Sequence, residues 1–155
     1  MTAATILLLI IVAAGLFLGR KQLVLRNDIT GEVYARYALR AGEPFSISFI
    51  HSVNNTRVTD VYDARSDGRI FLRKTIYYDF GAGVPFDLNE GETLSYAEDG
   101  AMIISGIDRE IPKFLLIVGT VSDHTLSLRG EEISLRDLCG RNTRIQIAYE
   151  SLLFG

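Results

Sequence analysis

The sequence has one cysteine, two histidines and no tryptophan, and its basic residues do not outnumber its acidic ones. The single cysteine, Cys139, excludes an internal disulfide, and no Cys/His spacing typical of a structural zinc site is present. Sixteen Lys and Arg against nineteen Asp and Glu give a net charge of -3. The basic stripe that nucleic-acid binding requires is missing. We therefore expect no metal, no cofactor and no nucleic-acid partner.

What the chain does have is one long apolar run at its start. Residues 3–19 carry no charge and a single hydroxyl, that of Thr5, before Arg20 and Lys21 follow. As a helix this run would be about 25 Å long, within the usable range for crossing a bilayer. It also accounts for the mean hydropathy of +0.19, because the remaining residues average about -0.1, as in an ordinary soluble domain. We expect residues 1–21 to form a membrane anchor that contacts lipid through residues 3–19.

A cleaved signal peptide is the main alternative to an anchor. No Lys or Arg precedes the run, and the one pattern resembling a cleavage site, Val12-Ala13-Ala14, lies inside it. An uncleaved, single-pass helix is therefore favoured. Its basic flank, Arg20, Lys21 and Arg26, follows the run, and the positive-inside rule would place the rest of the chain in the cytoplasm.

Residues 22–155 show short, often alternating apolar runs separated by Gly, Asn and Asp, which is typical of an all-β domain. We expect one antiparallel β-sandwich or open β-barrel domain. Residues 134–138, capped by Ser134, are the only helix candidate, and residues 107–113 are expected to form a charged loop. The predicted strands are residues 22–26, 33–38, 45–53, 56–64, 70–78, 93–96, 102–104, 114–118, 124–128 and 144–149.

The most informative stretch is a predicted hairpin around Asn54 and Asn55, a pair suited to a two-residue turn. In that register His51 lies opposite Val58 and diagonal to Asp60 on an apolar face, so their side chains would meet. The apolar face is expected to carry Phe45, Ile47, Phe49, His51, Val53, Val58, Asp60 and Tyr62, and the opposite face Ser46, Ser48, Ile50, Ser52, Arg57, Thr59, Val61 and Asp63.

The expected pair of His51 and Asp60 has three interpretations. A buried carboxylate needs a partner, so the pair could be structural and fix the strand register. His51 could instead contact a metal or a ligand carboxylate. A hydrolytic dyad would also need a nucleophile, and Ser52 points to the opposite face in this register.

Three other features have two interpretations each. Residues 81–86 contain Gly81, Gly83 and Pro85, which suit either a tight corner or a loop facing a ligand or partner. Cys139 is expected to be a small, partly buried residue, with a reactive thiol as the alternative. His124 is expected in a surface turn.

Four features of the sequence together resemble a known family. They are the apolar start, the strand His51-Ser52-Val53, the return strand at residues 58–62 and Phe-Gly-Ala-Gly-Val-Pro at residues 80–85. It comprises small prokaryotic proteins with a domain of unknown function, whose genes lie beside those of TAXI-type TRAP transporters. Two positions depart from its pattern: Arg57 stands in place of proline, and Asp60 in place of glutamate.

The resemblance implies a non-enzymatic, membrane-anchored accessory protein with an extracytoplasmic β domain at residues 22–155. Its partners would be the transporter's permease or solute-binding protein. A small extracytoplasmic hydrolase, or a small-ligand binding module, using His51 and Asp60 is the alternative. The candidate ligand- or partner-binding residues are His51, Ser52, Asp60, Tyr62, Gly81, Gly83 and Pro85.

Overall fold

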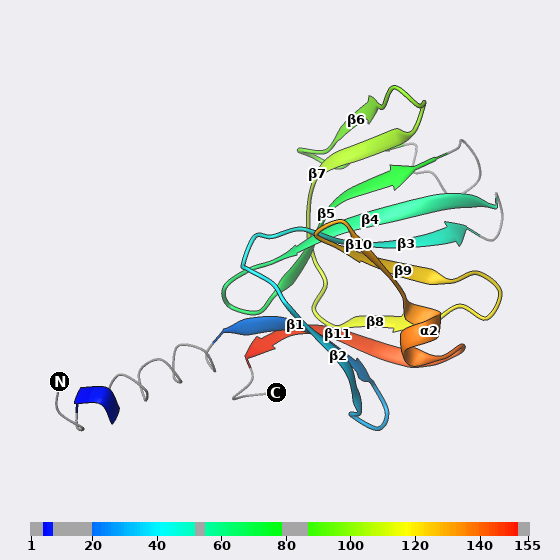
Figure 1. The fold of residues 1–155 in the computed structure, drawn as a ribbon. Coiled ribbons are helices and arrows are strands. Elements are labelled where there is room, and N and C mark those ends of the chain that lie inside the picture. Colours follow the sequence, from blue (N-terminus) through cyan, green and yellow to red (C-terminus); the bar gives the residue numbers. More distant parts are fainter. Residues whose placement is uncertain (1–4, 8–19, 52–54, 79–86, 152–155) are drawn as a thin grey trace.

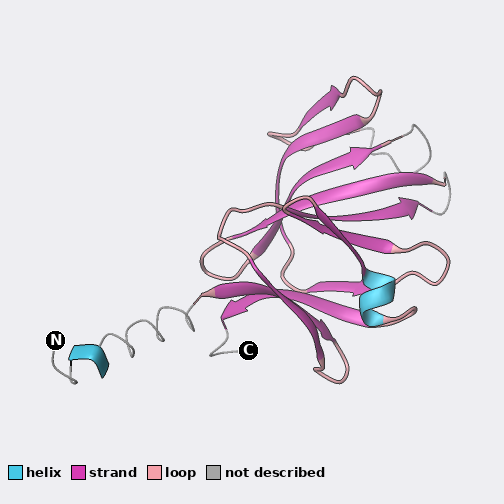
Figure 2. Ribbon diagram, viewed as in Figure 1, coloured by secondary structure: helices cyan, strands magenta, loops and turns pink. Residues whose placement is uncertain are grey.

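The computed structural model describes residues 5–7, 20–51, 55–78 and 87–151, and the fold is all-β with two antiparallel sheets (Figure 1). Beyond residues 5–7, the described chain has one short helix, α2 (Leu135–Cys139) (Figure 2). Sheet A has the order β2 (Val33–Ala38), β1 (Lys21–Asn27), β11 (Arg144–Ser151) and β8 (Phe114–Ile117). Sheet B has the order β10 (Glu131–Ser134), β9 (His124–Leu128), β3 (Phe45–His51), β4 (Thr56–Ala64), β5 (Ile70–Tyr77), β7 (Met102–Glu110) and β6 (Thr93–Tyr96).

The core lies between the two sheets and is built from alternating side chains. Strand β11 buries every second residue, as the period of two in a strand requires. Tyr62 of sheet B joins the layers, since its ring lies 5.5 Å from that of Phe45 and 4.7 Å from that of Phe114 in sheet A. The largest fully buried side chains are Phe45, Leu23, Leu25, Leu72, Leu126, Leu135, Ile145, Ile147, Val24 and Val118.

The prediction of an all-β domain is confirmed, and ten of the strands lie where the sequence predicts them, some with shifted ends. The predicted helical turn is also present, and the Ser134 side chain accepts a hydrogen bond from the Asp137 N–H at 3.0 Å. Two elements were predicted incorrectly. Strand β7 continues to Glu110 through the expected charged loop, and β10 was not predicted.

The acidic residues near the end of β7 form ion pairs with arginines that follow or belong to neighbouring strands. Asp108 pairs with Arg65 and Arg73, and the guanidinium of Arg65 lies 3.7 Å from the centre of the Phe71 ring. Phe71 is only 4% exposed. Asp108 and Glu110 of β7 thus pair with arginines that lie over the Phe71 ring.

The predicted register of the β3–β4 hairpin is wrong by two residues. His51 lies opposite Thr56, and Ile47 opposite Asp60. The connection takes residues 52–55 instead of two, with the Asn55 N–H donating to the His51 carbonyl at 2.8 Å and Asn55 at φ 54°. A shift of two keeps each residue on its predicted face. The opposite face is drier than expected, since Ser48 and Thr59 are buried and hydrogen-bonded at 2.8 Å.

The predicted anchor at residues 3–19 lies outside the described residues, apart from residues 5–7, which are helical. Among the residues that the structure describes, no helix has the length and apolar character needed to cross a membrane. The body of the domain begins at once after residue 20, because Lys21 opens β1 and pairs with Ser151 at the end of β11.

Candidate functional site

Asp60 lies in the middle of a row of residues that runs across the inner face of sheet B. Residues paired directly between neighbouring strands point to the same face, which places one carboxylate among mainly apolar side chains. We call this set the central row. Its members are Leu126, Ile47, Asp60, Thr75, Ile104 and Leu94.

Two hydroxyl groups hold the Asp60 carboxylate in place. Thr75 Oγ1 donates to Asp60 Oδ1 at 2.7 Å, and the Tyr62 hydroxyl donates to Asp60 Oδ2 at 3.3 Å. Thr75 is 6% exposed, so its hydroxyl depends on this acceptor. Burial, and then the charge of Asp60, raise the pKa of Tyr62 far above its usual value, which keeps the phenol protonated as a donor.

A second row lies beside the central row on the same face, toward the end of the hairpin. It is rich in aromatic side chains, and the Phe49 and His124 rings lie 5.6 Å apart. Burial, followed by the charge of Asp60, raises the pKa of Tyr77. We call this set the aromatic row. Its members are His124, Phe49, Val58, Tyr77, Met102 and Tyr96.

His124 was expected in a surface turn, but it opens β9 and is partly buried. Its Nδ1 accepts a hydrogen bond from the Gly119 N–H at 3.1 Å. Burial lowers the pKa of His124, while Asp123 acts in the opposite direction. A neutral ring with its proton on Nε2 fits both observations.

The contact predicted between His51 and Asp60 is not formed, because the two residues belong to different cross-strand rows. Asp60 is paired with Ile47, which lies four positions, or about 13 Å, from His51 along β3. Asp60 takes its hydrogen bonds from Thr75 and Tyr62 instead. The hydrolytic dyad considered for His51 and Asp60 therefore lacks its geometry.

The remaining predicted site residues are placed only in part. Tyr62 contacts Asp60 directly, as described above. His51 ends β3 on the inner face, beyond the aromatic row. Ser52, Gly81, Gly83 and Pro85 lie outside the described residues.

Three residues of this region were missed in the sequence: Thr75 and Tyr77, whose strand pairs with that of Asp60, and Arg109, whose charge acts on Tyr62 and Tyr77. Thr75 pairs directly with Asp60, and Tyr77 lies two residues further along β5. Arg109 is paired with Leu72, and its charge partly opposes the rise in the pKa of Tyr62 and Tyr77. Alternation puts Thr75 and Tyr77 on one face of β5. Their partners on β4 depend on the strand pairing and on the bulge between Val61 and Tyr62, which the sequence pattern does not give.

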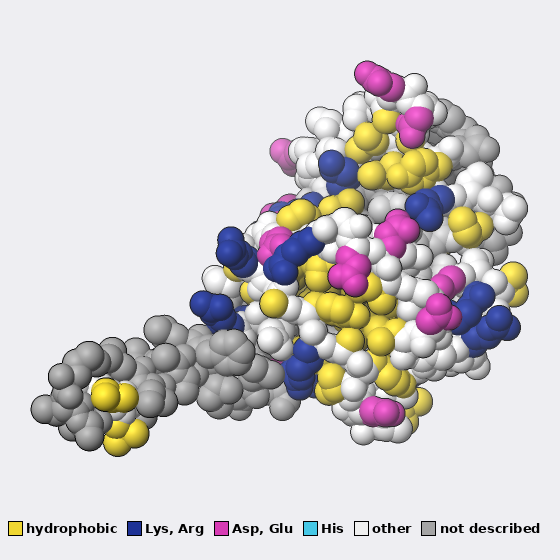
Figure 3. Space-filling view, in the orientation of Figure 1, with side chains coloured by type: hydrophobic (Ala, Val, Ile, Leu, Met, Phe, Trp, Pro, Cys, Tyr) yellow, Lys and Arg dark blue, Asp and Glu magenta, His cyan; other side chains and the backbone are white. Residues whose placement is uncertain are grey.

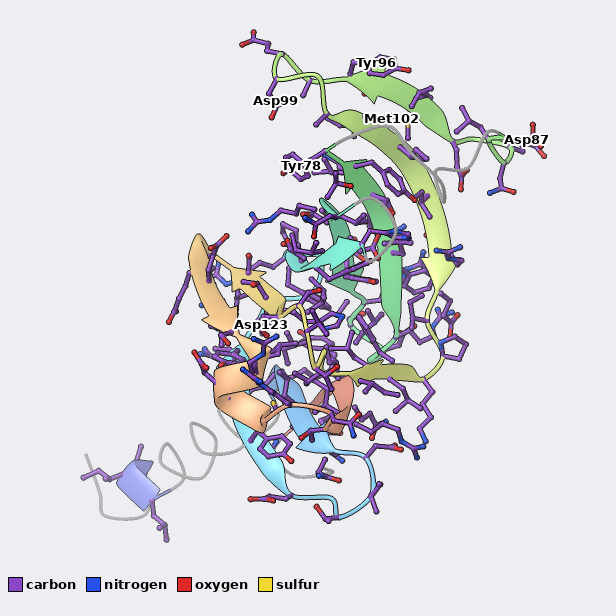
Figure 4. All side chains as sticks on the ribbon, turned by 90° about the vertical axis from the view of Figure 1, so that its right-hand side faces the viewer. Tyr78, Asp87, Tyr96, Asp99, Met102 and Asp123 are labelled. Carbon is purple, nitrogen blue, oxygen red and sulfur yellow. The ribbon has the colours of Figure 1, made fainter. Side chains whose placement is uncertain are left out.

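The outer end of both rows is accessible. Leu94 and Tyr96, on the edge strand β6, are 44% and 58% exposed. Figure 1 shows β6 and β7 at the side of sheet B farthest from sheet A, and Figure 3 shows hydrophobic side chains gathered over these two strands. Tyr96 and Met102 are labelled there in Figure 4.

Within the described ranges, no group of three His, Cys, Asp or Glu residues could hold a metal ion.

Comparison with known proteins gives one match. A family model described as a domain of unknown function (DUF1850) matches residues 45–135. This range begins with β3 and ends at the first residue of α2, so it includes every strand of sheet B. No curated protein and no solved structure matches the chain.

Proposed function

Because the chain belongs to the DUF1850 family, whose defining domain contains both rows, we propose that the accessible part of this face is its working surface. It comprises the half-buried Asp60 and the exposed Leu94 and Tyr96, and we call it the Asp60 face. The protein would be a membrane-anchored binding protein that acts without catalysis as an accessory to a solute transporter. Its partner would be the permease or the solute-binding protein of a TAXI-type TRAP transporter, and the β domain would be extracytoplasmic.

The position of Asp60 is the observation that supports a binding role. Placing a carboxylate in an apolar row costs free energy, and Thr75 and Tyr62 offset part of that cost. An ionised carboxylate offers about four acceptor positions, of which these hydroxyl groups use two. The others can accept N–H or O–H groups, or a cationic side chain, from a partner that also covers Leu94 and Tyr96.

The apolar N-terminal run supports the membrane anchor. Residues 3–19 have the composition of a single-pass helix, and β1 opens at Lys21, only two residues later. A domain joined so closely to a spanning helix would lie at the membrane surface, within reach of an integral permease.

Co-purification of the full chain from its native membranes tests the partnership. The tagged chain is expected to recover a permease or solute-binding subunit in mild detergent, identified by its peptides. Asp60→Asn keeps an acceptor for Thr75 but removes the charge, and should reduce that recovery. Glu98→Gln removes an exposed carboxylate and should leave recovery unchanged. Failure of the wild-type chain to recover either subunit would refute the proposal.

The side of the membrane is tested separately by cysteine labelling in intact cells. The sole native cysteine, Cys139, is buried, so a cysteine introduced at Val121, which is 90% exposed, reports alone. A membrane-impermeant maleimide should label Val121→Cys without permeabilisation. Labelling only after permeabilisation would place the domain in the cytoplasm and exclude contact with an extracytoplasmic binding protein.

A further inference from the structure

A cavity of about 570 Å³ opens at the end of the domain where β1 begins. Four of its nine lining residues are cationic: Arg20, Lys21, Arg40 and Arg129. None of the lining residues is acidic, although the chain as a whole carries a net charge of -3. Figure 3 shows Lys and Arg side chains gathered on the surface around the start of β1. The cavity is therefore a local concentration of positive charge on an acidic protein.

Among the described residues, three of the four cations have no carboxylate within ion-pair distance, although the charge of Arg40 also acts on Glu43. Within the described part of the chain, neither Arg20 nor Arg40 forms an ion pair, and the Lys21 ammonium lies 5.9 Å from the centre of the Tyr149 ring. Of the four cations, Arg129 has an ion pair within the described ranges, with Glu43, which lines the adjoining hollow. That pairing lowers the pKa of Glu43 to about 2, mainly through the hydrogen bond from Arg129.

Hydrogen bonds fix part of the cavity wall. The Tyr149 hydroxyl donates to the Leu39 carbonyl at 3.1 Å, and the Arg40 N–H donates to Glu43 at 2.9 Å. Arg129 has φ 54° in the turn between β9 and β10, a conformation that costs a residue with a side chain free energy. It also donates to the Ala38 carbonyl at 2.7 Å. The Arg129 guanidinium and the backbone at residues 38–40 are thus held before a ligand binds.

We propose that this cavity binds the phosphate group of an anionic phospholipid. The inference rests on the proposed anchor, since Arg20 directly follows residues 3–19 and would bring the cavity to the depth of the headgroups. Guanidinium groups bind phosphate oxygens through paired, charge-assisted hydrogen bonds, and basic residues beside a spanning helix attract anionic lipids. A zwitterionic headgroup would bind less well, because its own cation would face four others.

The test measures binding of short-chain, soluble lipids to the full chain in neutral detergent by native mass spectrometry. Dihexanoyl phosphatidylglycerol should bind more tightly than dihexanoyl phosphatidylcholine and than inorganic phosphate. Arg40→Gln should raise its Kd about tenfold, the loss of one charged hydrogen bond, and adding Arg20→Gln should raise it further. Arg57→Gln changes an exposed residue at the start of β4 that does not line the cavity, so it is the matched control and should have no effect. An unchanged melting curve would show that the variants fold.

Three results would overturn the proposal: equal binding of the two lipids, equal loss in Arg57→Gln, or inorganic phosphate binding as tightly as the lipid, which would indicate a site for a soluble anion. Alkaline carbonate extraction of the native membranes separates failure of the lipid site from failure of the membrane anchor. A chain that binds the soluble lipid but is extracted has the site without the anchor. One that resists extraction but shows no lipid preference has the anchor without the site.

Discussion

The hydrogen bond between Asp60 and Thr75 gives the sharpest stability prediction. Asp60→Ala removes the acceptor of the Thr75 hydroxyl, and Thr75 is buried, with 6% of its surface exposed. Leaving a buried hydroxyl without a partner costs about 1–3 kcal/mol. The Tyr62 hydroxyl, at 3.3 Å, adds less because its bond to Asp60 is longer. We expect the free energy of unfolding to fall by about 1–3 kcal/mol.

The companion variants separate this bond from other effects of the substitution. Thr75→Val removes the donor, so the double variant Asp60→Ala/Thr75→Val has no unpaired group at this position. It should be destabilised by clearly less than the sum of the two single variants, with a coupling of about 1–2 kcal/mol. Asp60→Asn still offers Thr75 a carbonyl acceptor and should retain most of the stability.

Urea unfolding of the full chain in mild detergent, followed by far-ultraviolet circular dichroism, measures these differences. Glu98→Ala is the control for loss of an exposed carboxylate and should shift the midpoint little. Additive losses in Asp60→Ala and Thr75→Val would mean that the two side chains do not interact, and the assignment of Asp60 to the central row would be refuted.

Three further predictions concern other parts of the fold. Burial lowers the pKa of His124, so the unfolded chain binds a proton at a higher pH than the folded chain does. The free energy of unfolding should therefore fall as the pH drops below about 6.5. In urea titrations His124→Gln should flatten this pH dependence, and an unchanged pH dependence would contradict the prediction. Gly106→Ala places a Cβ against the Gly91 carbonyl oxygen and should lower the melting temperature more than Gly31→Ala does. Gly31 also has a positive φ, of 76°, but a Cβ added there meets nothing within 4 Å. Burial raises the pKa of the Cys139 thiol to about 11, so a thiol reagent at neutral pH should react slowly with Cys139 until denaturant is added. Rapid reaction of the native chain would place Cys139 at the surface.

Most of the fold could be predicted from the sequence because alternation and turn residues act over short distances. Phe45, Ile47 and Tyr62 were assigned to the buried face, and all three are buried. The assignment to the buried face is correct although the predicted β3–β4 register is not, because the register is wrong by two residues and side chains alternate between faces with a period of two. Strand β10 escaped prediction because it has four residues and begins with Glu131 and Glu132.

The composition of the site was less predictable, because it depends on which strands become neighbours. Asp60 was recognised as a carboxylate that needs a partner, but its partner lies on β5, 15 residues away, beyond a bulge. The turn length was misjudged because two asparagines suit a two-residue connection, whereas the chain uses residues 52–55. Long-range pairing and bulges leave no periodic trace in a single sequence.

The central claim, that the Asp60 face binds a transporter subunit, is tested most directly by site-specific photo-crosslinking in native membranes. A photoreactive amino acid replaces Leu94, at the exposed end of the central row, or Val121, which is exposed in the loop between β8 and β9. The account predicts a crosslink to the permease or solute-binding protein from position 94, weakened by Asp60→Asn, and none from position 121. A crosslink to either subunit from position 121 but not from position 94 would contradict it.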